Sequence, residues 1–214
     1  MLKIIQKPVP HYRSGREGRQ IEAVIIHIGE GNQNQIFGKA DKVDEKSFGA
    51  FMNEEKSSHY SVDADGAVWQ FVQEKDTAWH CGIVVQPTSW LIRTKGGINP
   101  NLYTIGIEHA GWGNQDITEI QYRTTAELLK DICYRYNIKI DRDHIIGHRE
   151  IRNDKTCPGK IDIDKIIRMA EELKNPKIIL ATTYTSEYNK LQTQFTLLEK
   201  LVELWKKLNE FLKK

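Results

Sequence analysis

Residues 147–159 hold three side chains whose types could carry chemistry within one short segment. His148 and Cys157 lie close together in the sequence, and Lys155 comes just before the cysteine. Imidazole nitrogen and thiolate sulfur are good zinc ligands, and a nearby ammonium group lowers the pKa of a thiol. Glycine and proline at the ends of the segment mark it as a loop. Because two ligands do not hold a zinc ion, a metal site requires a third; a buried cysteine beside a surface histidine is the alternative.

His27 is the residue that could complete such a site. It ends the apolar run of residues 22–29, which predicts a strand buried on both faces. Strand ends open into clefts, so a histidine there is well placed for chemistry. With His148 and Cys157 it would supply three ligands and leave a fourth position for water, the arrangement of catalytic zinc. The other histidines that could serve as ligands instead are His59, His80, His109 and His144.

Two further residues extend this pattern to a hydrolase hypothesis. Glu108 stands near the end of another apolar run, residues 104–109, and could take the proton of a zinc-activated water. Lys155 could stabilise the oxyanion that forms when hydroxide attacks a carbonyl. The residues together indicate metal-assisted hydrolysis of an amide or ester.

The composition limits the classes of protein and partner. The 214 residues, 39% hydrophobic and 28% charged, suffice for one domain with an appendage or for two small domains. The net charge of +2 gives no electrostatic case for a nucleic-acid partner. Three cysteines cannot form a fully paired disulfide framework, which favours thiols or metal ligation. Residues 1–10 do not resemble a signal peptide, so we expect synthesis in the cytoplasm without one, and no spanning helix.

The pattern of apolar residues predicts an α/β fold with a central mixed β-sheet flanked by helices. We expect strands at 22–29, in a hairpin over 58–72, at 104–109 and within 138–146. A helix is expected at 44–53, with Phe48, Phe51 and Met52 on its inner face. A second helix should begin at a capping box of Thr118 and Gln121 and carry Cys133 on its core face, and a third should begin after Asp162. Residues 1–20 should be irregular and residues 83–101 a long surface loop.

The C-terminal residues predict a different kind of segment. We expect a catalytic domain over 1–175, a linker over 176–183 and a long amphipathic, coiled-coil-like helix over 184–214, in which apolar residues recur at four-three spacing. Self-association into a homo-oligomer is our first interpretation of this helix. Docking back on the catalytic domain is the second, and contact with a membrane surface through the flanking lysines is the third.

Five segments of the chain carry a resemblance to a known family. They are Val24-Ile25-Ile26-His27, Ser58-His59-Tyr60-Ser61-Val62-Asp63 with Asp65-Gly66, Ala78-Trp79-His80-Cys81-Gly82, Thr104-Ile105-Gly106-Ile107-Glu108, and Gly147-His148-Arg149-Glu150 with Lys155-Thr156-Cys157-Pro158-Gly159. In this order they resemble the zinc-dependent N-acetylmuramoyl-L-alanine amidases, the family of phage amidase endolysins and peptidoglycan recognition proteins. Five ordered motifs are far more specific than any one of them.

The resemblance implies that the chain cleaves the amide between the lactyl group of N-acetylmuramic acid and L-alanine, with peptidoglycan or a muropeptide as its partner. By position, the residues that match the family's Zn²⁺ ligands are His27, His148 and Cys157. Glu108 and Lys155 match a glutamate and a lysine that assist catalysis, and His80 matches a cleft residue that we expect to contact substrate.

The chain departs from some relatives at two positions. Ser58 stands where some phage members have a tyrosine, so we assign that role to Glu108 and no catalytic role to Tyr60. Cys157 stands where some members have aspartate, and non-catalytic recognition relatives lack this cysteine, which favours an active enzyme.

Three settings fit the resemblance. An endolysin-type hydrolase that reaches the cell wall after holin-type release is the first; a cytoplasmic muropeptide-recycling amidase and a non-catalytic peptidoglycan-binding module are the alternatives. Trp90 and Trp112, in glycine-containing loops, are weak candidates for stacking on a sugar. We expect His59 to be a packed strand residue, and His109 and His144 to lie at the surface or behind the ligands.

Overall fold

The computed structural model describes residues 2–29 and 45–174, together with 192–194, 196–198, 200, 201, 204 and 205. The chain divides into two compact units, Met1–Leu173 and Lys174–Lys214. The linker expected over 176–183 lies outside the described residues, so the three-part division of the sequence stays a prediction.

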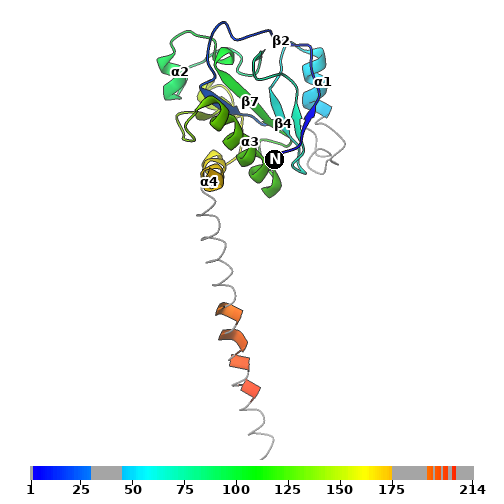
Figure 1. Ribbon diagram of the computed structural model, residues 1–214, viewed down its shortest axis with the longest axis vertical. Helices are drawn as coiled ribbons and strands as arrows, with labels where there is room; N and C mark the ends of the chain where they lie inside the picture. Colours follow the sequence, from blue (N-terminus) through cyan, green and yellow to red (C-terminus); the bar gives the residue numbers. More distant parts are fainter. Residues whose placement is uncertain are drawn as a thin grey trace, which may run out of the picture. The chain divides into compact units, whose positions relative to one another are not determined.

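A six-stranded sheet forms the centre of the first unit (Figure 1). Its order is β1 (Ile4–Gln6), β5 (Val68–Gln70), β4 (Tyr60–Val62), β7 (Thr104–His109), β3 (Ala23–Ile26) and β8 (Ile145–Gly147). Neighbouring strands are parallel except for β4 and β5, which form an antiparallel pair. The sheet is therefore mixed, as the sequence predicts. A separate two-stranded sheet pairs β2 (Tyr12–Arg13) with β6 (Thr77–Ala78).

Helices pack on both faces of this sheet. The α-helices are α1 (Glu45–Asn53), α2 (Trp90–Thr94), α3 (Glu119–Tyr136) and α4 (Ile163–Lys174), and the short 3₁₀ helices are η2 (Pro100–Leu102) and η3 (His148–Glu150). Val24 and Ile26 of β3 pack in one cluster with residues of α3 and α4. Ala23 and Ile25 pack in a second cluster with residues of α2 and η2. Because side chains alternate along a strand, β3 is buried on both faces, which confirms the expectation for this run.

Several local predictions are confirmed. The turn at Gly66, with φ +86°, joins β4 and β5 as the expected hairpin. Thr118 and Gln121 form the capping box of α3, and Cys133 is buried on the inner face of that helix. The backbone N–H of Lys165 donates to the carboxylate of Asp162 at the start of α4. These signals depend on residues close together in sequence, which is why sequence alone reveals them.

Other local predictions are wrong. Residues 1–20 are not wholly irregular, because β1 pairs with β5, with Ile4 opposite Val68. Residues 83–101 contain α2 and the start of η2, and the hydroxyl of Ser89 caps α2. On α1, Phe51 is 5% exposed and Phe48 packs partly buried against the same cluster, as expected, but Met52 is 41% exposed and does not face inward. The pairing of β1 depends on a partner far away in the sequence, which a local pattern does not reveal.

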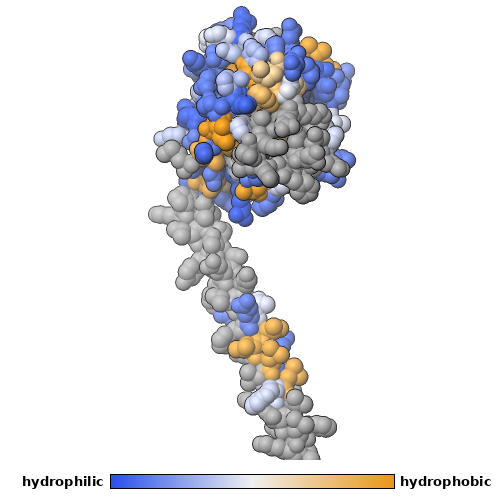
Figure 2. Space-filling model, turned by 90° about the vertical axis from the view of Figure 1, so that its right-hand side faces the viewer, coloured by the Kyte–Doolittle hydropathy of each residue, from blue (hydrophilic) through white to orange (hydrophobic). Residues whose placement is uncertain are grey.

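In the second unit, the described residues between 192 and 205 are helical. Their apolar side chains are exposed, and Figure 2 shows them gathered on this segment. The residues of this group are Leu197, Leu198, Leu201, Leu204 and Trp205. The remainder of the helix expected over 184–214 lies outside the described residues. Within the described part of the chain, no helix is long and apolar enough to cross a membrane.

Candidate active site

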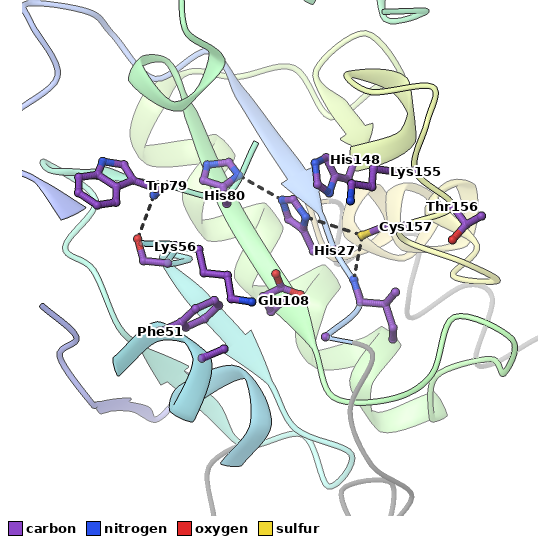
Figure 3. Close-up of a pocket in the computed structure, with 14 residues that line it drawn as sticks. His27, Phe51, Lys56, Trp79, His80, Glu108, His148, Lys155, Thr156 and Cys157 are labelled. Carbon is purple, nitrogen blue, oxygen red and sulfur yellow. Dashed lines mark hydrogen bonds between the residues drawn. The ribbon is translucent and has the colours of Figure 1, made fainter. Parts of the chain in front are cut away.

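The three expected metal ligands meet at the carboxyl ends of β3 and β8 (Figure 3). His27 directly follows β3, and His148 directly follows β8. These two strands are parallel neighbours with Ile26 opposite Gly147, so the next residue of each strand lies beside the other. The two imidazole rings accordingly have centroids 4.6 Å apart. Cys157 reaches the same place from a loop, and one ligand atom from each of the three residues lies within 4.8 Å of the others.

The spacing of these atoms fits a metal ion. The sulfur of Cys157 lies 3.7 Å from Nδ1 of His27. Zinc bonds of about 2.0 Å to nitrogen and about 2.3 Å to sulfur at the tetrahedral angle place the two ligand atoms about 3.6 Å apart. The two separations agree. Three protein ligands of this kind leave one tetrahedral position for water or substrate.

Hydrogen bonds hold two of these ligands in the state that binds a metal. The carbonyl oxygen of Cys81 lies 3.1 Å from Nε2 of His148. Because a carbonyl only accepts, Nε2 carries the hydrogen and Nδ1 keeps its lone pair for a metal. Burial lowers the pKa of His148, which keeps the ring neutral. The backbone N–H of Ile28 donates to the sulfur of Cys157 across 3.3 Å, a contact that stabilises a thiolate.

His27 is enclosed by other histidines. Its Nε2 lies 3.1 Å from Nδ1 of His80. Its carbonyl oxygen accepts a hydrogen bond of 2.8 Å from Nδ1 of His109, whose Nε2 accepts from the hydroxyl of Thr125. Burial first, and then the neighbouring His148 and His80, hold the pKa of His27 well below its ordinary range. Of the two positions expected for His109, the buried one behind the ligands is observed.

The ligands open into a cavity of about 450 Å³. The residues that line it are His27, Ile28, Gly29, Ala50, Phe51, Lys56, Ser57, Trp79, His80, Glu108, His148, Lys155, Thr156 and Cys157. Glu108 comes from β7, the strand that neighbours β3 on the side opposite β8. Lys155 is exposed and comes from the same loop as Cys157. The structure thus brings both expected catalytic residues to the cavity that holds the expected ligands (Figure 3).

His80 also lines this cavity, as the sequence predicts for a substrate contact. Both of its ring nitrogens, however, contact protein atoms: Nδ1 lies near His27 and Cys81, and Nε2 near Thr104. Its contact with substrate stays a prediction. Neither Trp90 nor Trp112 is among the lining residues, and Trp79 is the tryptophan found there.

Phe51 and Lys56 line the cavity although both lie outside the sequence motifs. Phe51 comes from α1, and Lys56 comes from the segment between α1 and β4. Figure 3 shows the amino group of Lys56 pointing toward Glu108. A lysine in a polar stretch of the chain looks like any surface lysine, so only the folded arrangement reveals its place in the cavity.

The second motif has a structural role in this chain. His59 is fully buried, as expected for a packed strand residue, and its Nε2 lies 2.8 Å from the guanidinium of Arg16. The hydroxyl of Tyr60 donates to Glu74 across 2.9 Å. Neither His59 nor Tyr60 lines the cavity, which agrees with the absence of a catalytic role for Tyr60.

Comparison with known proteins, like the geometry of the site, indicates an amide hydrolase. The family model described as N-acetylmuramoyl-L-alanine amidase matches residues 17–160. The 1,6-anhydro-N-acetylmuramyl-L-alanine amidase AmpD of Haemophilus influenzae is 29% identical over 161 residues, which cover 71% of this chain and 83% of AmpD. The N-acetylmuramoyl-L-alanine amidase AmiD of Escherichia coli is 31% identical over 159 residues, or 66% of this chain and 50% of AmiD.

Solved structures share the fold. A crystal structure of an AmpD derivative superposes with a TM-score of 0.60 at 22% identity, covering 79% of this chain and 95% of AmpD. The amidase LysC from Clostridium intestinale superposes with a TM-score of 0.54 at 18% identity, covering 78% of this chain and 95% of LysC. The sequence match includes every residue of the candidate site from His27 to Cys157. The chain belongs to the N-acetylmuramoyl-L-alanine amidase family and is a peptidoglycan amidase.

Proposed function

We propose that this chain is a zinc-dependent amidase that cleaves the bond between the lactyl group of N-acetylmuramic acid and L-alanine. The observation that carries the proposal is the convergence of His27, His148 and Cys157 at a cavity that Glu108 and Lys155 also line. Two imidazoles and a thiolate form a donor set suited to zinc, and their spacing matches its bond lengths.

The three ligands would hold the ion, and the remaining groups would handle protons and charge. When bound, Zn²⁺ supplies a Lewis acid that lowers the pKa of a water molecule to near neutrality. Glu108 accepts the proton of the attacking water and passes it to the nitrogen of the leaving L-alanine. The ammonium of Lys155 stabilises the negative charge that develops on the carbonyl oxygen.

Metal removal tests this proposal directly. The substrate is a soluble N-acetylmuramoyl-L-alanyl peptide, and the measurement is release of the free amino terminus of L-alanine. We expect chelator-treated protein to be inactive and added Zn²⁺ to restore cleavage. If the zinc-loaded protein binds peptidoglycan but releases no amino termini, the chain is a binding module and the proposal is wrong.

For the biological setting, we propose endolysin-type hydrolysis of the cell wall, after release of the protein from the cytoplasm. Support comes from the second unit, Lys174–Lys214, because an enzyme for soluble fragments needs no extension of this kind. Recycling of soluble muropeptides is the second candidate. It is favoured by the similarity to AmpD, which is named as an amidase of 1,6-anhydro-N-acetylmuramyl-L-alanine.

A comparison of two substrates separates these candidates. Purified, insoluble cell walls and soluble anhydromuropeptides are offered to the same zinc-loaded protein, and amino-terminus release is measured for each. Cleavage of walls at a rate similar to that of the soluble substrate supports the endolysin-type role. Cleavage of soluble fragments alone supports recycling.

We also propose that the C-terminal segment 184–214 joins copies of the chain. The exposed apolar residues between 197 and 205 support this role, because leucine and tryptophan side chains lose contact with water when helices associate. Contact of the same residues with a membrane surface is the alternative, since lysines flank the apolar positions.

A further inference from the structure

A row of hydrogen-bonding groups leads from the backbone of Pro100 to the metal ligand His27. The hydroxyl oxygen of Thr104 lies 2.8 Å from the carbonyl oxygen of Pro100 and 3.3 Å from Nε2 of His80. On the other side of the His80 ring, Nδ1 lies 3.1 Å from Nε2 of His27. The side chains of Thr104, His80 and His27 are all buried.

The position of each hydrogen in this row follows from the group at its start. A carbonyl only accepts, so two oxygens 2.8 Å apart require that the Thr104 hydroxyl donate to Pro100. Having used its only hydrogen, the Thr104 oxygen can only accept from His80. Nε2 of His80 therefore carries a hydrogen. The opposite tautomer would place two lone pairs against each other.

The same reasoning about hydrogen positions fixes the tautomer of His27. The rings of His80 and His27 are both buried, where the uncharged form of an imidazole is favoured, and a neutral imidazole carries one N–H. Nδ1 of His80 is therefore bare and accepts the hydrogen of His27 Nε2. Nδ1 of His27 is then bare as well, and this is the atom that lies 3.7 Å from the sulfur of Cys157. The lone pair that a metal needs is thus directed to the correct side of the ring.

Packing prevents the His80 ring from turning. A Cβ atom on Gly106 would lie 2.6 Å from Cγ of His80, so the ring rests directly on the backbone of β7. The side-chain oxygen of Asn101 accepts from the backbone N–H groups of His80 and Cys81, at 3.1 and 2.9 Å. The segment fixed in this way serves both histidine ligands, because the carbonyl of Cys81 accepts from His148.

We propose that Thr104 and His80 are positioning residues for the metal site: Thr104 sets the direction of the hydrogen bonds, and His80 holds His27 with Nδ1 free. The inference rests on the proposed zinc function of His27, His148 and Cys157. Thr104 does not line the cavity. Its effect on metal affinity is transmitted through the side chains of His80 and His27.

The first test is the Zn²⁺ affinity of metal-free protein, measured by competition with a chromophoric chelator. Thr104→Val keeps the shape of the side chain and removes the hydroxyl, whereas Thr104→Ser keeps the hydroxyl. We expect Thr104→Val to lower the affinity about tenfold and Thr104→Ser to leave it nearly unchanged. His80→Leu should lower it by about 10- to 100-fold, and His80→Asn, which keeps an acceptor near Nδ1, should restore most of the loss.

The second test needs no variant. Nitrogen-15 chemical shifts of the imidazole rings in metal-free wild-type protein distinguish the Nε2–H tautomer from the Nδ1–H tautomer. We expect His80, His27 and His148 to be Nε2–H tautomers. Equal zinc affinities of the valine and serine variants of Thr104, or an Nδ1–H tautomer at His80, would overturn the inference. If the wild-type protein binds no zinc, the proposed function fails instead, and the tautomer measurement still decides the hydrogen-bond directions.

Discussion

The backbone N–H of Ile28 donates a hydrogen bond to the sulfur of Cys157 across 3.3 Å, although the two residues lie 129 positions apart in the sequence. Ile28 follows His27, so the contact docks the loop that carries the last ligand on the strand end that carries the first. A backbone N–H just beyond the end of β3 therefore contacts the sulfur directly. This arrangement leads to the first prediction.

Replacing Cys157 should separate metal binding from folding. We expect Cys157→Ser to lose bound zinc and to lower amidase activity by more than about 100-fold, because a hydroxyl is a much poorer zinc ligand than a thiolate. Cys157→Asp supplies a carboxylate and should retain part of both. Cys133→Ala is the matched control, since this buried thiol lies in the core cluster of α3 and not in the cavity. Zinc content after gel filtration, with amino-terminus release, gives the answer. Full zinc content in the serine variant would contradict the ligand assignment.

Replacing Glu108 should affect proton transfer and leave the metal in place. Glu108→Gln keeps the size of the side chain and removes its basicity, so we expect kcat to fall by about 10²- to 10⁴-fold with unchanged zinc content. Glu119→Gln, at the exposed start of α3, is the control and should retain wild-type kcat. A glutamine variant of Glu108 with normal kcat would exclude this residue as the general base.

Two roles are open to Lys155, and kinetics and metal binding can separate them. As an oxyanion stabiliser, it acts on the transition state, and Lys155→Met should lower kcat by about 10²- to 10³-fold with little change in zinc affinity. As a group that tunes Cys157, it acts on the thiolate, and the same variant should mainly weaken zinc binding. We expect the first result, with partial recovery of kcat in Lys155→Arg. A loss confined to zinc affinity would assign the lysine to the thiolate.

The stability of the fold should decline in mild acid, in part through His59. Burial first, and then the adjacent Arg16, hold the pKa of His59 well below its ordinary value. The unfolded chain protonates this histidine near pH 6.5, whereas the folded chain does not, so the stabilisation is complete above about pH 6.5 and is lost as the pH falls below it. His59→Asn keeps an acceptor for the N–H of Gly106 and cannot titrate.

The unfolding free energies of wild type and His59→Asn are compared at two pH values. We expect His59→Asn to be less stable than wild type near neutral pH but to lose less unfolding free energy between pH 7.5 and pH 5. Urea titrations of metal-free protein measure both quantities. His27 and His80 are present in both proteins, so the difference in slope reports the titration of His59 together with its effect on the neighbouring His80. Parallel losses in the two proteins would show that His59 does not contribute to acid sensitivity.

Deleting residues 184–214 tests the proposed association of the C-terminal segment. The exposed leucines between 197 and 204 would be buried in an assembly, so we expect the full chain to be oligomeric and the truncated chain to be a monomer. Light scattering coupled to gel filtration measures both masses. A monomeric full chain that binds anionic lipid vesicles, while the truncated chain does not, would move the assignment to membrane contact.

The sequence by itself determined which side chains are available for chemistry and which local elements carry them. Residue type and ordered motifs singled out His27, His148 and Cys157 as candidate ligands, because few side chains bind zinc and each stands beside a strong strand or loop signal. The capping box of Thr118 and the hairpin turn at Gly66 were equally readable. In each case the residues that decide the structure lie within a few positions of one another.

Only the tertiary structure decided what those residues touch. The parallel pairing of β3 with β8 brings together residues more than 100 positions apart, and no local pattern records the register that places His27 beside His148. Lys56 stands in no motif, and the motif that contains Thr104 assigns that residue no role. Their relation to the site follows from the sheet order and from the packing of His80 on Gly106. Hydrogen-bond direction and ring orientation depend on neighbours in space, and the fold alone supplies those neighbours.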